Sequence, residues 1–316
     1  MSPRTRVYAV VAATAALAVG GVVAVTWLQT RGETTAAPGS VAKPRPGVPP
    51  LLFDFGTQSG AEPRDLATAA ALLKSGKRAQ AAAIFGRYHS VQAQIGSTFA
   101  RWPDGSLDAM KEIVAKHPKD PVAQLHYGLA LYWSGRNADA VKALQQVDRR
   151  FADSPSAVDA EDLLYAGRFF PGLPYMVAPV RLPEAPTLAA QLATAKSDPL
   201  VFGVMLWRLD RRVSARRALD AAVRANPNDP LTLTLAAVSH FTKTKPAAAF
   251  GRLGPLTGRF PRSSVVRLHL GLLLLWERQV KKGAAQLRLA AADGPSTLYG
   301  RQAKKLIAAL VPNGTK

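Results

Sequence analysis

Cysteine is absent from this chain of 316 residues. Disulfide bonds, cysteine nucleophiles, thiolate-bound zinc and iron–sulfur clusters are therefore excluded. Acidic side chains are also scarce, because 21 Asp and Glu stand against 41 Lys and Arg, which gives a formal charge of +20. This excess favours anionic partners such as acidic lipid, wall polymer, nucleic acid or an acidic protein, and it is equally typical of a solvated basic surface.

Sequence patterns of catalysis are missing as well, with neither a glycine-rich phosphate loop nor a nucleophile elbow. No histidine has a second ligand at metal-binding spacing on one predicted helix. We interpret all five as structural residues: His89, His117, His126, His240 and His269. Asp159, Glu161 and Asp162 fall where we expect the first turns of a helix, whose dipole they suit. The sequence therefore predicts a protein without enzymatic activity, cofactor or metal.

A long apolar run follows a short basic tail at residues 1–6. Residues 7–28 carry no charge and, at about 1.5 Å per helical residue, are long enough to cross a bilayer. Arg4 and Arg6 precede the run, and Trp27 lies near its far end, as an interfacial anchor does. We favour an uncleaved signal-anchor over a signal peptide, whose apolar region is usually shorter. The charge bias predicts a single-pass membrane protein with its C-terminal domain outside the cytoplasm.

A linker rich in proline and glycine occupies residues 29–60. Its central stretch, "AAPGSVAKPRPGVPP", is unable to form a hydrophobic core and is typical of an extended spacer. The apolar clump "LLFDF" at residues 51–55 follows it. This clump is either a strand-like segment that docks onto the next domain or a lead-in to the first helix.

From residue 61 to residue 316 the apolar pattern is helical, and no stretch alternates convincingly as a strand does. Small residues and prolines recur every 34 residues, which indicates an internal repeat. The series are Gly203, Ala237 and Gly271; Ala215, Ala249 and Gly283; and Pro227, Pro261 and Pro295. Small residues allow two helices to approach closely, and each proline ends the second helix.

This spacing resembles the tetratricopeptide repeat (TPR) family, most strongly over residues 121–154 and 196–297. The matching positions are Gly128, Leu131, Ala140 and Leu144; Gly203, Leu206, Ala215, Leu219 and Pro227; Ala237, Ala249, Leu253 and Pro261; and Gly271, Leu274, Gly283, Leu287 and Pro295. The early tryptophan of the family is absent, His240 replaces an apolar residue, and Ala152 stands where a proline is expected. The resemblance implies an all-α fold, an α-α superhelix of the TPR type, in a membrane-anchored bacterial-type protein.

Two stretches depart from the repeat. Between about Arg78 and Arg101 the pattern predicts one long helix. Residues 169–186 contain five prolines and replace a normal turn, either as a binding element or as a flap packed on the groove of the same chain. A capping helix is expected near residues 297–311. The arginine pairs Arg149-Arg150, Arg211-Arg212 and Arg216-Arg217 are expected on the outer, convex surface.

The resemblance also implies that the first helix of each unit lines a concave groove. The groove positions are apolar and end in aromatic residues: Leu125, Leu129, Tyr132, Trp133, Leu200, Val204, Trp207, Val238, Phe241, Leu268, Leu272 and Trp276. They lack the basic and amide clamp with which some TPR domains hold a peptide carboxylate. An apolar groove favours an apolar helix or extended peptide, unless residues 51–55 or 169–186 cover it.

These observations predict a membrane-anchored, non-catalytic scaffold or assembly factor for protein–protein interaction. Its partner would be a protein or peptide with an apolar segment, acidic overall if the basic rim steers it. The alternative is adhesion of the basic solenoid surface to anionic lipid, wall polymer or nucleic acid. Nucleic acid is the weakest of these, because no aromatic residues interleave with the arginine pairs as a stacking platform requires.

Overall fold

The structure, a computed structural model, describes residues 43–55, 58 and 60–310, and all regular elements in these residues are α-helices. The helices are α2 (Ala61–Lys74), α3 (Arg78–Phe85), α4 (Val91–Ala100), α5 (Ser106–Lys116), α6 (Pro121–Trp133), α7 (Asn137–Arg150), α8 (Pro155–Leu164), α9 (Leu188–Ala195), α10 (Pro199–Arg208), α11 (Arg212–Ala225), α12 (Pro230–Ser239), α13 (Ala247–Arg259), α14 (Ser264–Trp276), α15 (Val280–Asp293) and α16 (Leu298–Leu310).

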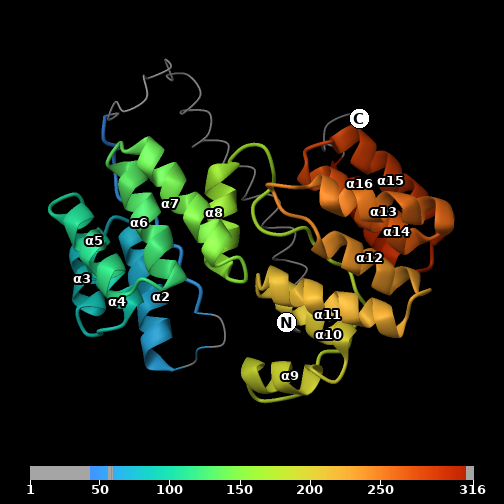
Figure 1. The fold of residues 1–316 in the computed structure, drawn as a ribbon, viewed down its shortest axis with the longest axis horizontal. Coiled ribbons are helices and arrows are strands. Elements are labelled where there is room, and N and C mark those ends of the chain that lie inside the picture. Colours follow the sequence, from blue (N-terminus) through green and yellow to red (C-terminus); the bar gives the residue numbers. More distant parts are fainter. Residues whose placement is uncertain (1–42, 56–57, 59, 311–316) are drawn as a thin grey trace.

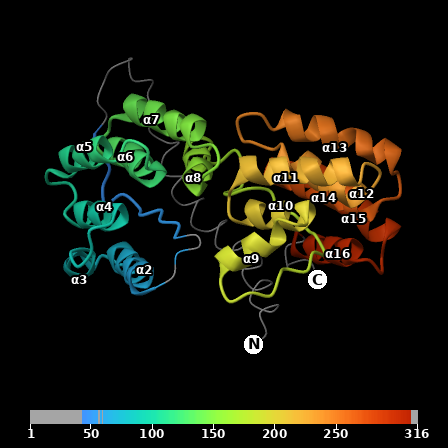
Figure 2. The same cartoon turned by 60° about the horizontal axis from the view of Figure 1, so that its bottom comes forward.

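The helices form two blocks of the same design. In the first block the hairpins α2/α3, α4/α5 and α6/α7 stack in order, and the single helix α8 closes the stack. In the second block α10/α11, α12/α13 and α14/α15 stack in the same way and α16 closes them. The short helix α9 lies between the blocks in sequence and contacts α10. Figures 1 and 2 show the blocks side by side, with α8 on the edge that faces α11.

Local sequence explains where the helices begin. Asp120, Asp198 and Asp229 each precede a proline at the first helical position, and each carboxylate accepts a hydrogen bond from a backbone amide in the first turn. Proline fits this position because its missing N–H has no partner there, and the aspartate satisfies one of the free amides. Helices α6 and α12 therefore start at the same point of the repeat, whereas α10 starts three residues later relative to Gly203.

Close packing within the hairpins explains the small residues. A Cβ added to Gly203 would lie 2.6 Å from Cγ of Leu219, and one added to Gly128 would lie 2.9 Å from Cδ2 of Leu144. The glycine therefore receives the leucine of the second helix, while the alanine that precedes the leucine is fully buried, as Ala140 is. The helical hairpins predicted from the repeat are present.

The prediction of one long helix over residues 78–101 is wrong. Helix α3 ends at Phe85, and Ser90 caps a new helix by accepting a hydrogen bond from the Ala93 amide. The ring of Phe85 packs against Gly96, where a Cβ would lie 2.4 Å from it. This contact folds α4 back against α3, and α4 then pairs with α5, where Ser106 Oγ donates to the Thr98 carbonyl at 3.0 Å.

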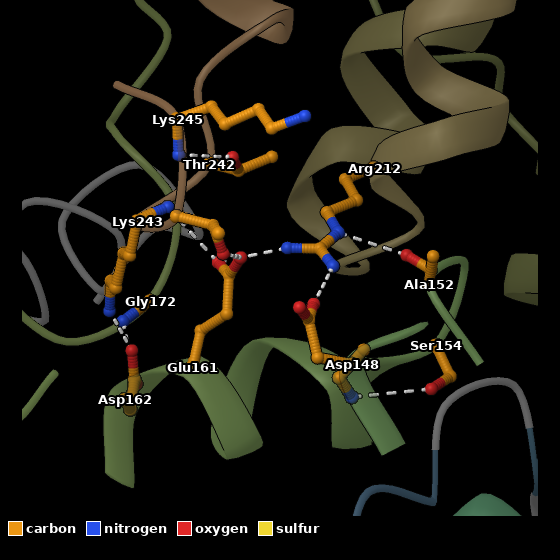
Figure 3. Close-up of polar contacts among 12 residues, drawn as sticks. Asp148, Ala152, Ser154, Glu161, Asp162, Gly172, Arg212, Thr242, Lys243 and Lys245 are labelled. Carbon is orange, nitrogen blue, oxygen red and sulfur yellow. Dashed lines mark hydrogen bonds and ion pairs between the residues drawn. The ribbon is translucent and has the colours of Figure 1, made fainter. Parts of the chain in front are cut away.

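The two blocks are joined by a buried network of charges, shown in Figure 3. Arg212 begins α11, and its guanidinium donates to the Ala152 carbonyl at 3.0 Å and pairs with Asp148 of α7. The same guanidinium lies 2.9 Å from Glu161 of α8, and the two side chains are 7% and 2% exposed. Lys243, which follows α12, pairs with Asp162 of α8.

This network corrects two sequence-based predictions. Arg212 lies at the junction of the blocks and is not on the convex surface, although Arg211 beside it is exposed. Glu161 and Asp162 neutralise buried cations from the second block, and none of the three acidic residues lies in the first turn of α8, which begins at Pro155. The order of the elements therefore brings charges together that are far apart in the repeat pattern.

In the described part of the chain, no helix has both the length and the apolar character that a membrane crossing requires. The predicted signal-anchor at residues 7–28 lies outside the described residues.

Candidate protein-interaction surface

The candidate groove residues lie mainly inside the molecule. Eight of the twelve side chains are buried, with at most 5% of the residue surface exposed: Leu125, Leu129, Val204, Trp207, Val238, Phe241, Leu268 and Leu272. The other four are partly buried: Tyr132, Trp133, Leu200 and Trp276. Two segments of the same chain, one in each block, lie against part of this face, where Leu52 packs with Leu125 and Val177 packs with Leu268 and Leu272. The groove is thus covered from within, one of the two possibilities that the sequence left open.

The first covering segment is residues 45–52, which lie along α6. The Arg45 amide donates to the Trp133 carbonyl at 2.8 Å, and the Leu52 amide donates to Nε2 of His126 at 3.0 Å. The Arg45 guanidinium also stacks on the Tyr132 ring, 3.4 Å from its centroid. Because Trp133 is the last residue of α6, its carbonyl has no partner within the helix, and the segment supplies one.

The second covering segment is residues 170–177, which lie along α14. The Phe170 amide donates to the Trp276 carbonyl at 3.2 Å, and the Val177 amide donates to Nε2 of His269 at 3.0 Å. Trp276 is the last residue of α14, as Trp133 is of α6. Both segments therefore run antiparallel to their helix, and they use the same two contact points at the same spacing.

The two segments also share a sequence. Residues 46–49 read Pro-Gly-Val-Pro and residues 171–174 read Pro-Gly-Leu-Pro, in the same position between the two amide donors. The glycines, Gly47 and Gly172, have φ angles of 82° and 75°, which favour glycine, as in type II turns. The second proline of each copy is buried, whereas the first is exposed.

The surfaces that receive the segments match as well. Beneath Leu52, α6, α7 and α8 contribute four buried residues. Beneath Val177, α14, α15 and α16 contribute six, and four of these lie at the same relative positions. The matching sets are Leu125, Leu144, Val147 and Ala160, and Leu268, Leu287, Ala290 and Ala303. The molecule therefore contains the same segment-binding surface twice, each time filled by its own chain.

The chemistry of the two histidines fixes their protonation. Nδ1 of His126 lies 2.7 Å from the Val122 carbonyl, and Nδ1 of His269 lies 2.8 Å from the Val265 carbonyl. A carbonyl oxygen only accepts, so Nδ1 carries the proton and Nε2 is free to accept the segment amide. Burial lowers the pKa of each imidazole to about 4, which keeps both rings neutral at physiological pH.

Carboxylates gather where the first segment meets the junction of the blocks. Burial raises the pKa of Asp159 to about 7, with further contributions from Asp210 and Asp54. Burial and Asp54 raise the pKa of Asp210 to about 6. Burial lowers the pKa of Lys243 to about 8. The charge at this edge therefore changes within the physiological range of pH.

The sequence predicted the covering segments as alternatives and missed the residues that hold them. Phe53 and Phe55 pack on the first block. Residues 51–55 are therefore a docking segment, which was one of the two alternatives, and not merely a lead-in to the first helix. Residues 169–186 pack on the second block, where Trp207 Nε1 donates to the Pro174 carbonyl at 2.8 Å. His126 and His269 were interpreted as isolated structural residues, although both stand two positions before the glycine of their repeat.

A tetratricopeptide repeat family model matches residues 103–161, which run from the turn before α5 into α8. No curated protein matches the sequence. Among solved structures, the crystal structure of yeast Tom70 is similar at 14% sequence identity and a TM-score of 0.31, over 83% of this chain. The alignment spans 66% of that structure's own length. The chain thus contains tetratricopeptide repeat sequence within an all-helical stack of hairpins.

Proposed function

We propose that this protein is a non-catalytic scaffold that binds other proteins, anchored in a membrane by residues 7–28 with its helical blocks outside the cytoplasm. The observation that carries the proposal is the repeated surface on α6 and α14. Each surface holds an extended polypeptide through a helix-end carbonyl, a neutral histidine and apolar contacts. Main-chain hydrogen bonds combined with side-chain pockets are one of the ways in which extended peptides are recognised.

Partner binding is tested by photo-cross-linking in intact membranes. A photoreactive residue replaces Trp133, which is partly buried at the end of the inner helix α6. The matched control replaces Val141, which is 44% exposed on the second helix α7. We expect one discrete protein adduct from the Trp133 position and none from the Val141 position. Equal adducts from both positions, or none from either in a folded protein, would reject the scaffold.

Membrane anchoring is tested separately by fractionation. The full chain should sediment with membranes and resist extraction at high salt, whereas a chain that begins at residue 29 should appear in the supernatant. External protease should degrade the helical blocks in spheroplasts without lysis. A chain lacking residues 7–28 that still sediments would place the anchor elsewhere.

Adhesion to an anionic surface is a second candidate, favoured by exposed arginines on the second helices of the hairpins. Arg149 and Arg150 are exposed on α7, and Arg217 is exposed on α11. Attachment by these side chains would be screened by salt, since exposed charges interact little beyond about 10 Å at 0.1 M ionic strength. If the chain beginning at residue 29 binds anionic vesicles and leaves them at 0.5 M salt, adhesion replaces the scaffold as the primary function.

A further inference from the structure

We propose that the α6 surface is a recognition site for an extended segment of a partner protein with the sequence Pro-Gly-aliphatic-Pro followed by apolar residues. Residues 45–52 occupy this site as an internal ligand that the partner segment replaces. The inference rests on the proposed scaffold function and names the chemistry of the partner.

The sequence preference follows from the two internal copies. They agree at the first proline, the glycine, an aliphatic residue, the second proline and the pair of apolar residues at the end: 46–52 and 171–177. Each shared feature has a physical role, because the glycine adopts a positive φ and the second proline is buried. Proline also restricts the backbone of the free segment, which lowers the entropy lost on docking. The neutral histidine then selects a backbone amide at a fixed distance from the helix end.

The α14 surface is closed by additional hydrogen bonds. Between its two end contacts, the Gly172 amide donates to Asp162 at 2.8 Å, and its carbonyl accepts from Trp276 Nε1 at 3.4 Å. The Pro174 carbonyl accepts from Trp207 Nε1. Helices α8 and α9 also hold this segment at both ends. The second copy is therefore a fixed part of the fold.

The α6 surface holds its segment less firmly. Within the described residues, polar contacts to residues 45–52 are confined to Arg45 and Leu52 at its two ends. Residues 47–52 also line a pocket of about 570 Å³ together with α2 and the turn that contains Gly76. Between its two polar ends the segment is held by apolar contacts of Val48, Leu51 and Leu52, and the same sequence from another chain can make these contacts.

A binding experiment with the full-length chain in detergent tests this inference. The probe is a fluorescent peptide with the sequence of residues 43–55, and binding is read as fluorescence anisotropy. The matched control peptide carries valine in place of the glycine. The chain is compared with its Gly47→Val variant, in which the internal ligand is strained because φ is 82° and a β-branched side chain disfavours that angle.

We expect the Gly47→Val chain to bind the native peptide about tenfold more tightly than the unchanged chain does, because its own segment competes less well. The valine peptide should bind each chain about tenfold more weakly than the native peptide does. In the Gly47→Val background, His126→Leu should abolish binding and His126→Gln, which retains an acceptor oxygen, should restore part of it. Circular dichroism confirms that each variant is folded.

Three results would overturn the inference: equal affinity for the two peptides, no gain from Gly47→Val, or binding that is unaffected by His126→Leu. A segment from a second copy of this chain is the competing occupant. A photoreactive residue at Arg45, in chains mixed with tagged unchanged chains, would reveal it as a cross-linked dimer, and that result would replace a partner protein with self-association. Absence of peptide binding together with an intact Trp133 adduct rejects the recognition sequence alone. Peptide binding without any Trp133 adduct in membranes rejects the scaffold.

Discussion

Replacement of Glu161 by alanine should destabilise the protein strongly, because this carboxylate is the centre of the buried network between the blocks. Its side chain is 2% exposed and lies 2.9 Å from Arg212. It also accepts hydrogen bonds from the Lys243 amide at 3.3 Å and from Thr244 Oγ1 at 3.1 Å. Removing one partner of a buried ion pair typically costs about 3–5 kcal/mol, since the other charge stays buried without compensation.

The assay is urea denaturation of the full-length chain, followed by far-ultraviolet circular dichroism. The matched control is Glu184→Ala, because Glu184 pairs with Arg181 at 2.8 Å while both side chains are more than 85% exposed. The control should cost less than about 1 kcal/mol. Arg212→Met should lower the unfolding free energy much less in the Glu161→Ala background than in the unchanged chain. In that background the arginine is already an uncompensated buried charge, and the methionine removes it. If Glu161→Ala cost no more than the control, the network would not hold the blocks together.

Two further predictions concern packing and pH. Gly203→Ala should lower the unfolding free energy by about 1–3 kcal/mol, because the added methyl group overpacks against Leu219. Gly251→Ala is the matched control, and it should raise the unfolding free energy by about 0.5–1 kcal/mol because the space around its Cβ is open. Equal effects of the two substitutions in thermal melts would contradict this. The pKa of His126 is about 4 in the folded chain and near 6.5 in the unfolded chain. As pH falls, the unfolded chain therefore takes up its proton first and is stabilised relative to the folded chain. The stability advantage of the unchanged chain over His126→Gln should therefore shrink by about 3 kcal/mol between pH 7 and pH 4; a constant difference would contradict the lowered pKa. The comparison with a variant is needed because Asp159, with its raised pKa, has the opposite effect on the profile.

The hairpins could be predicted from the sequence because close contacts recur at fixed spacing. Gly203 and Leu219 touch within one hairpin, so a local rule is enough to find them. The break between α3 and α4 escaped prediction because the turn at residues 86–90 lacks proline and the apolar pattern continues through it. Its cause is the contact between Phe85 and Gly96, which a periodic pattern does not reveal.

The residues that join the blocks, and those that hold the segments, depend on contacts between distant parts of the chain. Arg212 has the same sequence surroundings as the exposed arginines that follow it, and its burial comes from α7 and α8 of the other block. A signal for the segment sites was nevertheless present in the sequence. Pro-Gly-aliphatic-Pro occurs at residues 46–49 and 171–174, and histidine stands two positions before the glycine in two repeats. Comparing these irregular stretches with each other reveals the duplication.

The central claim is that His126 and His269 hold two equivalent segments through neutral rings that accept backbone amides at Nε2. Nitrogen-15 NMR of the imidazoles, recorded on the full-length chain from pH 7 to pH 5, tests it most directly. The account predicts that both rings remain neutral, with the proton on Nδ1, over this whole range. Titration of either ring near pH 6.5, or a proton on Nε2, would contradict it.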